Sequence, residues 1–491
     1  AVVSTVRESH RDLSLSVGGG DRNGKRLVSR VTDAGQDAAR TTFYEYYQDP
    51  ENRYINGRLK AVRHSDGTWE RWVYQDVGGV AAIETRYSSW KDVSIEDYEQ
   101  GRKEQTTITD SQVDRVTFVE GQQVAKSQFL TSTDPLTGIL LSTERSWDGA
   151  AWHEQVTAFA PAGTNAVNSG RPLYLLRSDG TAETYAYQKL NDDRIRVTTT
   201  SGTGDKDAVT DGLRTVRTFD SRKNLLEEEV FDVASDLRLS KRVGSEVDPM
   251  GRPTKWTYDD DPDDFDVSRS GPYGLEYTRN RSGATASYFR DLLGRTIRVD
   301  RKASTTAVTV SELTSYDQNV TTTHLTDGTK QLFAGQTIRN LGTGGSCCGG
   351  AGSLLVTSKA PDADGDGQPE TTVRSTVHSE HGATTTVTLP DGSTSVTTHY
   401  LDGRVKAVSG SAVPDQTFDY GVHQENGGGL WTRTYQDGLA QWTTTYSDTL
   451  GRTFRTTRAG GSSITRTYYP VDAPIGSRGR LHTVTDPDGT T

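Results

Sequence analysis

Cysteine, methionine and long apolar runs are scarce in this sequence. Its 491 residues include 2 Cys and 1 Met, and no run of 18 or more apolar residues is present that could cross a membrane. The hydrophobic residues AVILMFWYC make up 32% of the chain. Globular domains reach roughly 45–50% on a slightly wider residue set. Any hydrophobic core must therefore be thin relative to the chain length.

An excess of basic charge is also missing. The sequence has 55 Lys+Arg against 66 Asp+Glu, a net charge of −11, and a nucleic-acid-binding protein usually needs a basic stripe. We therefore expect no nucleic-acid partner. The first residues show no charged start followed by an apolar block, so no signal peptide is visible. The final DPDGTT begins another turn, and we expect the chain to be part of a longer protein.

Glycine and aromatic residues are abundant and regularly spaced, with 50 Gly, 21 Tyr and 8 Trp. Regular spacing argues against disorder as the reason for the low apolar content. The clearest unit is 437–457, which reads as a turn, a strand ending at Tyr446, a second turn and a second strand. A near copy at 391–408 ends its first strand at Tyr400. Weaker copies occupy 65–76, 178–188, 248–260 and 290–301.

The spacing of bulky residues within these copies predicts strands. A large side chain stands two or four positions before each terminal tyrosine: Trp72/Tyr74, Tyr185/Tyr187, Trp256/Tyr258, Val396/Tyr400 and Trp442/Tyr446. Even separations place both side chains on one face of a strand. One segment, 94–105, has helical character, and Ser94 could cap a short charged helix there. The chain is therefore predicted to be an all-β repeat of antiparallel hairpins.

Four segments follow from this pattern. Residues 1–63 form a polar N-terminal arm and the first hairpins, and 64–339 form a first block of repeats. Residues 340–370 form an insertion loop that is rich in Gly and Cys and then in Asp. The repeats resume over 371–491.

The paired turn motifs resemble the YD-repeat of rearrangement-hot-spot (RHS) proteins. The D-x-x-G-R form occurs at 248–252, at Asp291-Leu292-Leu293-Gly294-Arg295, and at Asp448-Thr449-Leu450-Gly451-Arg452 after Tyr446. A shorter form is Tyr400-Leu401-Asp402-Gly403-Arg404. Together with Tyr74, Tyr187, Tyr258 and Trp442, these residues are the predicted structural positions of the repeat. The arginines after glycine could pair with neighbouring aspartates or stack on the rings.

The resemblance implies a spiralling β-sheet of hairpins that curls into a hollow shell, or part of one. In bacterial members the shell encloses a toxic C-terminal polypeptide, and in teneurin-like animal relatives it belongs to a large cell-surface adhesion protein. A bacterial secreted or cell-surface location is implied in the same way, with other parts of the same polypeptide as partners. No P-x-x-x-x-D-P-x-G-type self-cleavage segment is found, so neither self-cleavage nor a toxin payload is expected within these residues.

An acidic segment at 361–370 has the spacing of a calcium loop. Asp362, Asp364 and Asp366 alternate before Gly367, and Gln368 and Glu370 could complete a shell of oxygen ligands. The twelfth position is Val373, which excludes an EF-hand. Ca²⁺ binding and a solvated acidic turn are the two interpretations, and calcium titration followed by thermal unfolding separates them.

The two cysteines, Cys347 and Cys348, are adjacent. A long-range disulfide within the chain is impossible, and the spacing is not that of a metal site. A strained vicinal disulfide, a crosslink to another copy and two reduced thiols remain open. Mass spectrometry with and without reductant distinguishes them.

Enzyme motifs are missing. The sequence has no G-x-S-x-G elbow and no G-x-x-x-x-G-K-[ST] phosphate loop, so we predict no catalytic residues. The leading hypothesis is a structural β-shell segment of a large secreted or cell-surface protein that encapsulates or displays a polypeptide. The alternatives are a self-assembling or adhesive extracellular fibre module, in which unpaired edge strands join copies, and a carbohydrate-binding β-repeat domain. The burial of Trp72, Trp256 and Trp442 should discriminate between the shell and carbohydrate binding.

Overall fold

The fold was analysed in a computed structural model of the chain. The residues it describes are 6–17, 20–32, 40–49, 51–52, 54–64, 66–78, 81–163, 167–190, 192–250, 252–259, 264–271, 274–281, 283–304, 306–317, 320–342, 353–363, 368–379, 381–436, 440–474 and 477–490.

Thirty-six strands make up most of this part of the chain. The first twelve are β1 (Val6–Val17), β2 (Gly20–Thr32), β3 (Arg40–Tyr46), β4 (Leu59–His64), β5 (Trp69–Val77), β6 (Ala81–Ser88), β7 (Arg102–Ile108), β8 (Gln112–Val119), β9 (Gln122–Thr133), β10 (Leu140–Trp147), β11 (Trp152–Phe159) and β12 (Pro172–Arg177). The next twelve are β13 (Thr181–Lys189), β14 (Ile195–Thr203), β15 (Leu213–Phe219), β16 (Leu225–Asp232), β17 (Arg238–Val247), β18 (Pro253–Tyr258), β19 (Phe265–Gly271), β20 (Gly274–Arg281), β21 (Ala284–Arg290), β22 (Thr296–Lys302), β23 (Val310–Asp317) and β24 (Val320–Thr326).

The last twelve strands are β25 (Gln331–Gly342), β26 (Ser353–Ala360), β27 (Glu370–Ser379), β28 (Gly382–Thr388), β29 (Thr394–His399), β30 (Val405–Ser409), β31 (Gln416–His423), β32 (Gly429–Gln436), β33 (Gln441–Ser447), β34 (Thr453–Arg458), β35 (Ser463–Tyr468) and β36 (Leu481–Thr485). Two short 3₁₀ helices, η1 (Tyr98–Gln100) and η2 (Glu425–Gly427), lie in connections. No helix in the described residues is long and apolar enough to cross a membrane.

The strands form one continuous antiparallel meander. Each strand pairs with the strand before it and the strand after it, from the β1–β2 hairpin to the β35–β36 hairpin. Within the described residues, the end strands β1 and β36 pair on one side only, so the sheet is not closed into a barrel. The all-β prediction of consecutive hairpins is confirmed.

The sheet forms a wall one layer thick. The accessible surface is 28263 Å² for a chain of 53.6 kDa, whereas a compact monomer of this mass exposes roughly 18,000 Å². Extensive contacts between elements join strands that are neighbours in the sequence, and the β9–β32 contact is an exception among the described elements. The large surface therefore follows from the absence of a second packed layer over most of this sheet.

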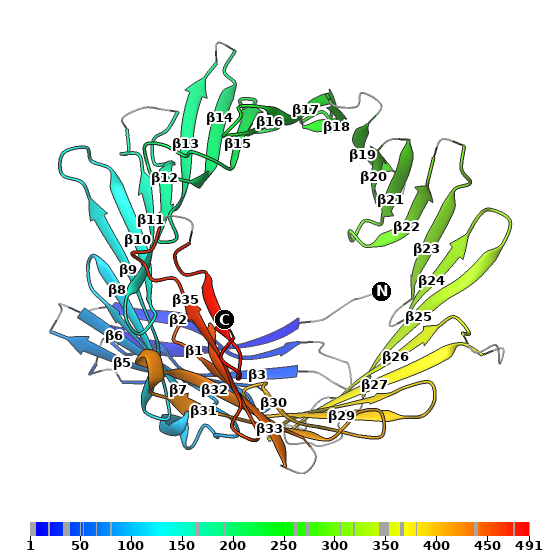
Figure 1. The fold of residues 1–491 in the computed structure, drawn as a ribbon. Coiled ribbons are helices and arrows are strands. Elements are labelled where there is room, and N and C mark those ends of the chain that lie inside the picture. Colours follow the sequence, from blue (N-terminus) through cyan, green and yellow to red (C-terminus); the bar gives the residue numbers. More distant parts are fainter. Residues whose placement is uncertain are drawn as a thin grey trace.

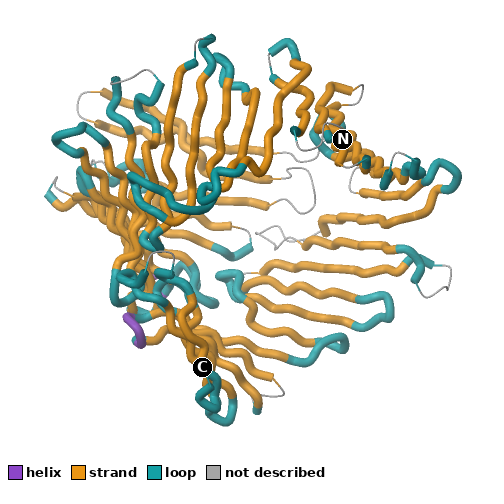
Figure 2. Tube along the Cα trace, turned by 45° about the horizontal axis from the view of Figure 1, so that its top comes forward, coloured by secondary structure: helices purple, strands orange, loops and turns teal. Residues whose placement is uncertain are grey.

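The wall curls into a ring and then overlaps itself. Figure 1 shows the strands following one another around the ring, with the C-terminal strands returning to the N-terminal third. Figure 2 shows the strands side by side along the wall. Hydrogen bonds across the overlap join residues 300 to 328 positions apart. One circuit of the wall therefore takes about 300 residues, and this chain completes it.

Short aspartate turns reverse the chain between strands. In the D-G-[ST] form, one carboxylate oxygen accepts both the N–H and the hydroxyl of the residue two positions on. Asp66 and Thr68 show this at 3.0 and 2.6 Å, and Asp179 and Thr181 at 2.9 and 2.7 Å. The intervening Gly67 and Gly180 have φ of 86° and 82°, a region that glycine enters at little cost. The same geometry recurs after Asp327, Asp391 and Asp488.

The D-x-x-G-R turns use the aspartate differently. Asp291 Oδ1 accepts the N–H groups of Leu293 and Arg295 at 2.9 Å, and Oδ2 accepts Arg295 Nε at 2.7 Å. Asp248 and Asp448 hold their turns through the same three bonds. The predicted Arg–Asp pairing is confirmed in these turns, and the carboxylate fixes both the turn and the arginine.

The arginine then ties its hairpin to the next. Arg295 lies over the ring of Tyr316 at 4.5 Å, while the Tyr316 hydroxyl donates to the Thr296 carbonyl at 2.8 Å. Arg452 with Tyr468, Arg404 with Tyr420 and Arg171 with Tyr187 repeat this arrangement. Cation–π contact and a satisfied hydroxyl explain why tyrosine, rather than phenylalanine, recurs at this position.

Replacing the turn aspartate by alanine tests this account. Asp291 is in a turn with an exposed tip, and Asp448 is 6% exposed. Asp291→Ala leaves N–H groups that water can reach, so we expect only a small loss in the free energy of unfolding. Asp448→Ala leaves the part-buried N–H groups of Leu450 and Arg452 without an acceptor, and we expect a larger loss of about 2 kcal/mol. Urea denaturation of both variants measures the difference, and equal losses would contradict it.

Two segments differ from the sequence-based expectation. The helix predicted over 94–105 is limited to η1, because Ile95 packs against buried Trp69 and the chain resumes pairing with β6 and β8 from Arg102. A Cβ on Gly101 would lie 2.4 Å from the Ser88 carbonyl oxygen, so this close approach also requires glycine. Residues 353–360, inside the predicted 340–370 loop, form β26 and pair with β25 and β27.

Candidate functional site

The overlap between the two circuits brings together connections from distant parts of the sequence. The connections that follow β4, β6, β8, β10 and β12 lie against those that follow β27, β29, β31, β33 and β35. We call this line of contact the seam. Each step along it advances both circuits by two strands, so the seam keeps one register throughout.

At the second step of the seam, the connection after β6 meets the turn after β29. The Lys91 N–H donates to Asp402 Oδ2 at 2.9 Å, and Lys91 Nζ pairs with Asp419 at 2.8 Å. Lys406 Nζ pairs with Asp92 at 2.7 Å. In the D-x-x-G-R turns the aspartate is the first residue, but here Tyr400 occupies that place. Asp402 is therefore free to use one oxygen across the seam.

Further along, the turn after β33 reaches the connection after β10. The Thr449 hydroxyl donates to the Trp147 carbonyl at 2.5 Å, and Arg452 Nη2 lies 3.3 Å from Asp148 Oδ2. His153 Nε2 is 2.7 Å from the same carboxylate oxygen. Arg452, clamped by its own Asp448 at 2.7 Å, therefore also reaches the first circuit.

A hydrophobic cluster also crosses the seam. Trp90, Val119 and Val124 of the first circuit are buried, and Tyr420, Val422 and Leu430 of the second pack against them. Trp90 is 3% exposed and its Nε1–H donates to Glu120 at 3.1 Å. Arg404 lies 4.0 Å from the Trp90 ring. Part of the small core is thus built between the circuits rather than on a face of the sheet.

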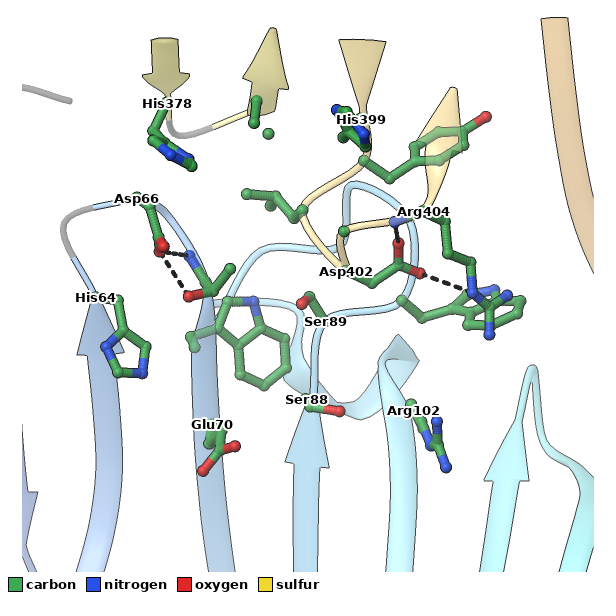
Figure 3. A pocket seen from close by; sticks show the side chains of 18 of the residues that line it. His64, Asp66, Glu70, Ser88, Ser89, Arg102, His378, His399, Asp402 and Arg404 are labelled. Carbon is green, nitrogen blue, oxygen red and sulfur yellow. Dashed lines mark hydrogen bonds and ion pairs between the residues drawn. The ribbon is translucent and has the colours of Figure 1, made fainter. Parts of the chain in front are cut away.

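A cleft of about 580 Å³ lies where the seam begins. Residues of both circuits line it (Figure 3). Those from the first circuit include His64, Asp66, Glu70, Ser88, Ser89 and Arg102, and those from the second include His378, His399, Asp402 and Arg404. The cleft therefore exists only while the two circuits are in contact.

Histidines from both circuits lie near one carboxylate in the cleft. Burial works to raise the pKa of Asp66, but hydrogen bonds from Thr68 and the nearby imidazoles of His64 and His378 outweigh burial and lower that pKa. His64 Nδ1 is 3.0 Å from the Thr42 hydroxyl. His399 Nδ1 is buried and has no hydrogen-bond partner among the described residues.

The cationic side of the cleft is held in place by ring contacts. Burial lowers the pKa of Arg404, and the charge of Asp402 acts in the opposite direction. Its guanidinium lies between Trp90 at 4.0 Å and Tyr420 at 5.0 Å. The charges of Glu70 and Arg86 are likewise paired with each other. The Arg404–Trp90 contact joins the two circuits, whereas Glu70 and Arg86 both belong to the first circuit.

Among the described residues, no group of three or more His, Cys, Asp or Glu side chains is arranged to hold a metal ion. The calcium loop and the cysteine pair stay predictions, because Asp364, Asp366, Cys347 and Cys348 lie outside the described residues. Asp362 is exposed, and Glu370 begins β27 opposite Ala360. A rise in the unfolding temperature on adding millimolar Ca²⁺ is the expected result if the loop binds it.

The three discriminating tryptophans are all half-buried. Arg86, Arg242 and Arg433 lie 6.0, 4.8 and 4.8 Å from the rings of Trp72, Trp256 and Trp442. Trp69 and Trp90 in the cleft are each 3% exposed. Trp72, Trp256 and Trp442 are therefore neither fully buried nor fully exposed, and their burial does not decide between the shell and carbohydrate binding.

The predicted repeat residues fall into two groups. Tyr400, Gly403, Arg404, Asp448, Gly451 and Arg452 lie in seam turns, whereas Asp291, Gly294 and Arg295 occupy a turn outside the seam. Tyr187 and Tyr258 lie in β13 and β18, and Tyr74 packs edge-on against Tyr47.

Sequence reasoning missed Trp90, Lys91, Asp148 and Gly427, because the contacts they make are with residues about 300 positions away.

Acid is expected to weaken the seam through Asp148. Burial would raise the pKa of this carboxyl, but hydrogen bonds from His153, Ala151 and Ala150 outweigh burial and hold the pKa at about 2. Because the folded pKa lies below the unfolded value of about 3.9, the carboxylate stabilises the fold above pH 4. That contribution is lost as the pH falls toward 2.

We expect Asp148→Asn to cost about 1–2 kcal/mol near pH 6, after allowing for solvent screening. The difference from the unmodified chain should shrink between pH 4 and pH 2. Urea denaturation over this range measures it. A difference that stays constant with pH would contradict the assignment.

Comparisons with known proteins were made for the whole chain. No protein-family model matches it, and no curated protein matches it. Among the solved structures that align with it are TcdB2–TccC3–TEV and TcdB2–TccC3 without the hypervariable C-terminal region, at 8% and 9% identity. The alignments cover 95% and 98% of this chain but 32% and 34% of those chains, and the TM-score is 0.17 in both cases. The chain spans about a third of their length, and a likeness this weak carries no argument.

Proposed function

We propose that this chain is a structural, non-catalytic shell segment whose curved wall surrounds or displays another polypeptide. The observation that carries the proposal is the overlap of the wall with itself. A single-layer sheet, with 36 strands in the part of the chain that the structure describes, returns after about 300 residues and is fastened by ion pairs, hydrogen bonds and a buried cluster. A wall built only to present an edge or a face would not need such a seam.

The energetics of the wall support this role. Side chains on a single-layer sheet are reached by solvent or by an enclosed chain, and isolated hairpins are marginally stable. Stacking successive hairpins makes the stability approximately a sum over neighbours. The Arg–Tyr ties and the seam add long-range support to this sum. The resemblance to RHS repeats points to the same role, with other parts of a longer bacterial polypeptide as the enclosed chain.

Protection of an attached polypeptide tests the proposal. An unfolded reporter segment is fused after Thr491, and its digestion by a broad protease is followed by mass spectrometry. We expect slower digestion than for the same segment fused to a compact protein of similar size. The matched control carries Gly427→Ala, which is expected to separate the circuits and to restore rapid digestion. Equal digestion in all three would overturn encapsulation.

A further inference from the structure

The wall has two rims, and the seam joins one to the other. We call the connections that follow odd-numbered strands the odd rim, and those that follow even-numbered strands the even rim. Because the strands alternate in direction, each set lies along one edge of the wall. At the seam, the odd rim of β29–β36 packs on the even rim of β6–β13. The two rims are therefore complementary surfaces.

The same odd-rim turn occurs outside the seam with its tip exposed. Leu292 occupies the position in its D-x-x-G-R turn that Thr449 occupies in the seam. Thr449 is 8% exposed and Leu292 is 91% exposed. Leu293 and Met250, at the next position of their turns, are 65% and 62% exposed. The hydrogen bonds that shape the turns are the same, so only the partner rim differs.

Apolar tips of this kind recur along both unpartnered rims. On the odd rim, Leu136 between β9 and β10 is 94% exposed. On the even rim, Leu237 between β16 and β17 is 64% exposed, and Val308 between β22 and β23 is 68% exposed. Single exposed leucines are ordinary. Here, however, the exposed odd-rim leucines lie along the same edge of the wall as Leu401. Leu401 is inside the seam, where it is 4% exposed.

We propose that the free odd rim of β9–β22 docks on the free even rim of β14–β25 of a second copy of this chain, so that the walls stack head to tail. The seam supplies the template for this contact, since it already joins these two kinds of rim in one molecule. Two different surfaces meet in such a contact, so each copy keeps one free rim of each kind and the stack continues. This goes beyond the shell role, and it uses turn tips rather than the edge strands β1 and β36.

Rim variants of the full 491-residue chain test the stack. The odd-rim variant carries Leu292→Asp and Leu293→Asp, and the even-rim variant carries Leu237→Asp and Val308→Asp. Sedimentation velocity over a hundredfold range of concentration should show growing oligomers for the unmodified chain and monomers for each variant alone. Phe43→Asp is the matched control, because Phe43 is 52% exposed in the middle of β3, away from both rims. It should assemble like the unmodified chain.

Mixing the two variants separates head-to-tail stacking from other assemblies. The odd-rim variant keeps an unmodified even rim that can still dock, and the even-rim variant keeps an unmodified odd rim. A 1:1 mixture should therefore form dimers and nothing larger. Circular dichroism of each variant confirms that the wall is folded. The proposal is overturned if the unmodified chain stays monomeric at every concentration, or if folded variants fail to form dimers on mixing. Neither result changes what is expected from the protease-protection test of the shell.

Discussion

Alanine at Gly427 is expected to separate the two circuits of the wall. In the present structure the backbone of Gly427 lies directly against that of Gly149, and a Cβ on Gly427 would be 2.2 Å from Gly149 Cα. A Cβ on Gly149 would be 2.0 Å from the Asn426 carbonyl oxygen. Both clashes are with backbone, which a side-chain rotation cannot relieve. The connections after β10 and β31 would have to move apart.

The cost of this change has two parts. Gly427 has φ of 80°, so alanine adds backbone strain of about 1 kcal/mol. The clash adds about 1–3 kcal/mol more. Gly294 has φ of 78° and no atom within 4 Å of its added Cβ, so Gly294→Ala isolates the strain. We expect Gly427→Ala to lower the free energy of unfolding by about 2 kcal/mol more than Gly294→Ala.

Urea denaturation measures the stability of both glycine variants, and limited proteolysis reports the seam directly. Cleavage within 424–428 should be faster in Gly427→Ala and unchanged in Gly294→Ala. If the two variants lose the same stability and resist protease equally, the backbone contact between the circuits does not hold in solution.

Truncation of Trp90 should produce the largest loss of any single side chain at the seam. Its ring packs in the cluster with Val119 and Val124, and Arg404 of the second circuit covers it at 4.0 Å. Replacing a buried tryptophan by alanine costs about 3–5 kcal/mol, and here the Glu120 carboxylate also loses a donor. We expect a loss in this range, together with faster proteolysis of the segment 402–430.

Trp256 provides the matched control for this truncation. Its ring is half-buried in β18 and Arg242 lies over it at 4.8 Å, so it shares the cation–π contact but lies outside the seam. We expect Trp256→Ala to cost about 1–2 kcal/mol, from partial burial. Similar losses for the two variants in urea denaturation would mean that the cross-seam cluster adds no stability.

Much of the fold could be predicted because its rules are local. Asp66, Asp179 and Asp391 form turns with residues two positions away, and alternate aromatic residues share a strand face. The hairpins over 101–170 carry a weaker form of the sequence pattern. The β8–β9 turn, for example, uses Glu120 and Gly121, with φ of 49° and 74°, in place of an Asp-Gly pair. A backbone requirement met by another residue leaves a weaker pattern in the sequence.

Local residue chemistry specifies the repeating unit of this protein: an aspartate–glycine turn, an arginine and a tyrosine that join one hairpin to the next. The place where the wall meets itself is a property of the whole folded sheet. That position depends on small twists and bends accumulated over a whole circuit of strands, and no short segment encodes their sum. The D-x-x-G-R turns show the result most directly. Asp291 and Asp448 form the same bonds, yet one turn tip is exposed and the other is buried across the seam.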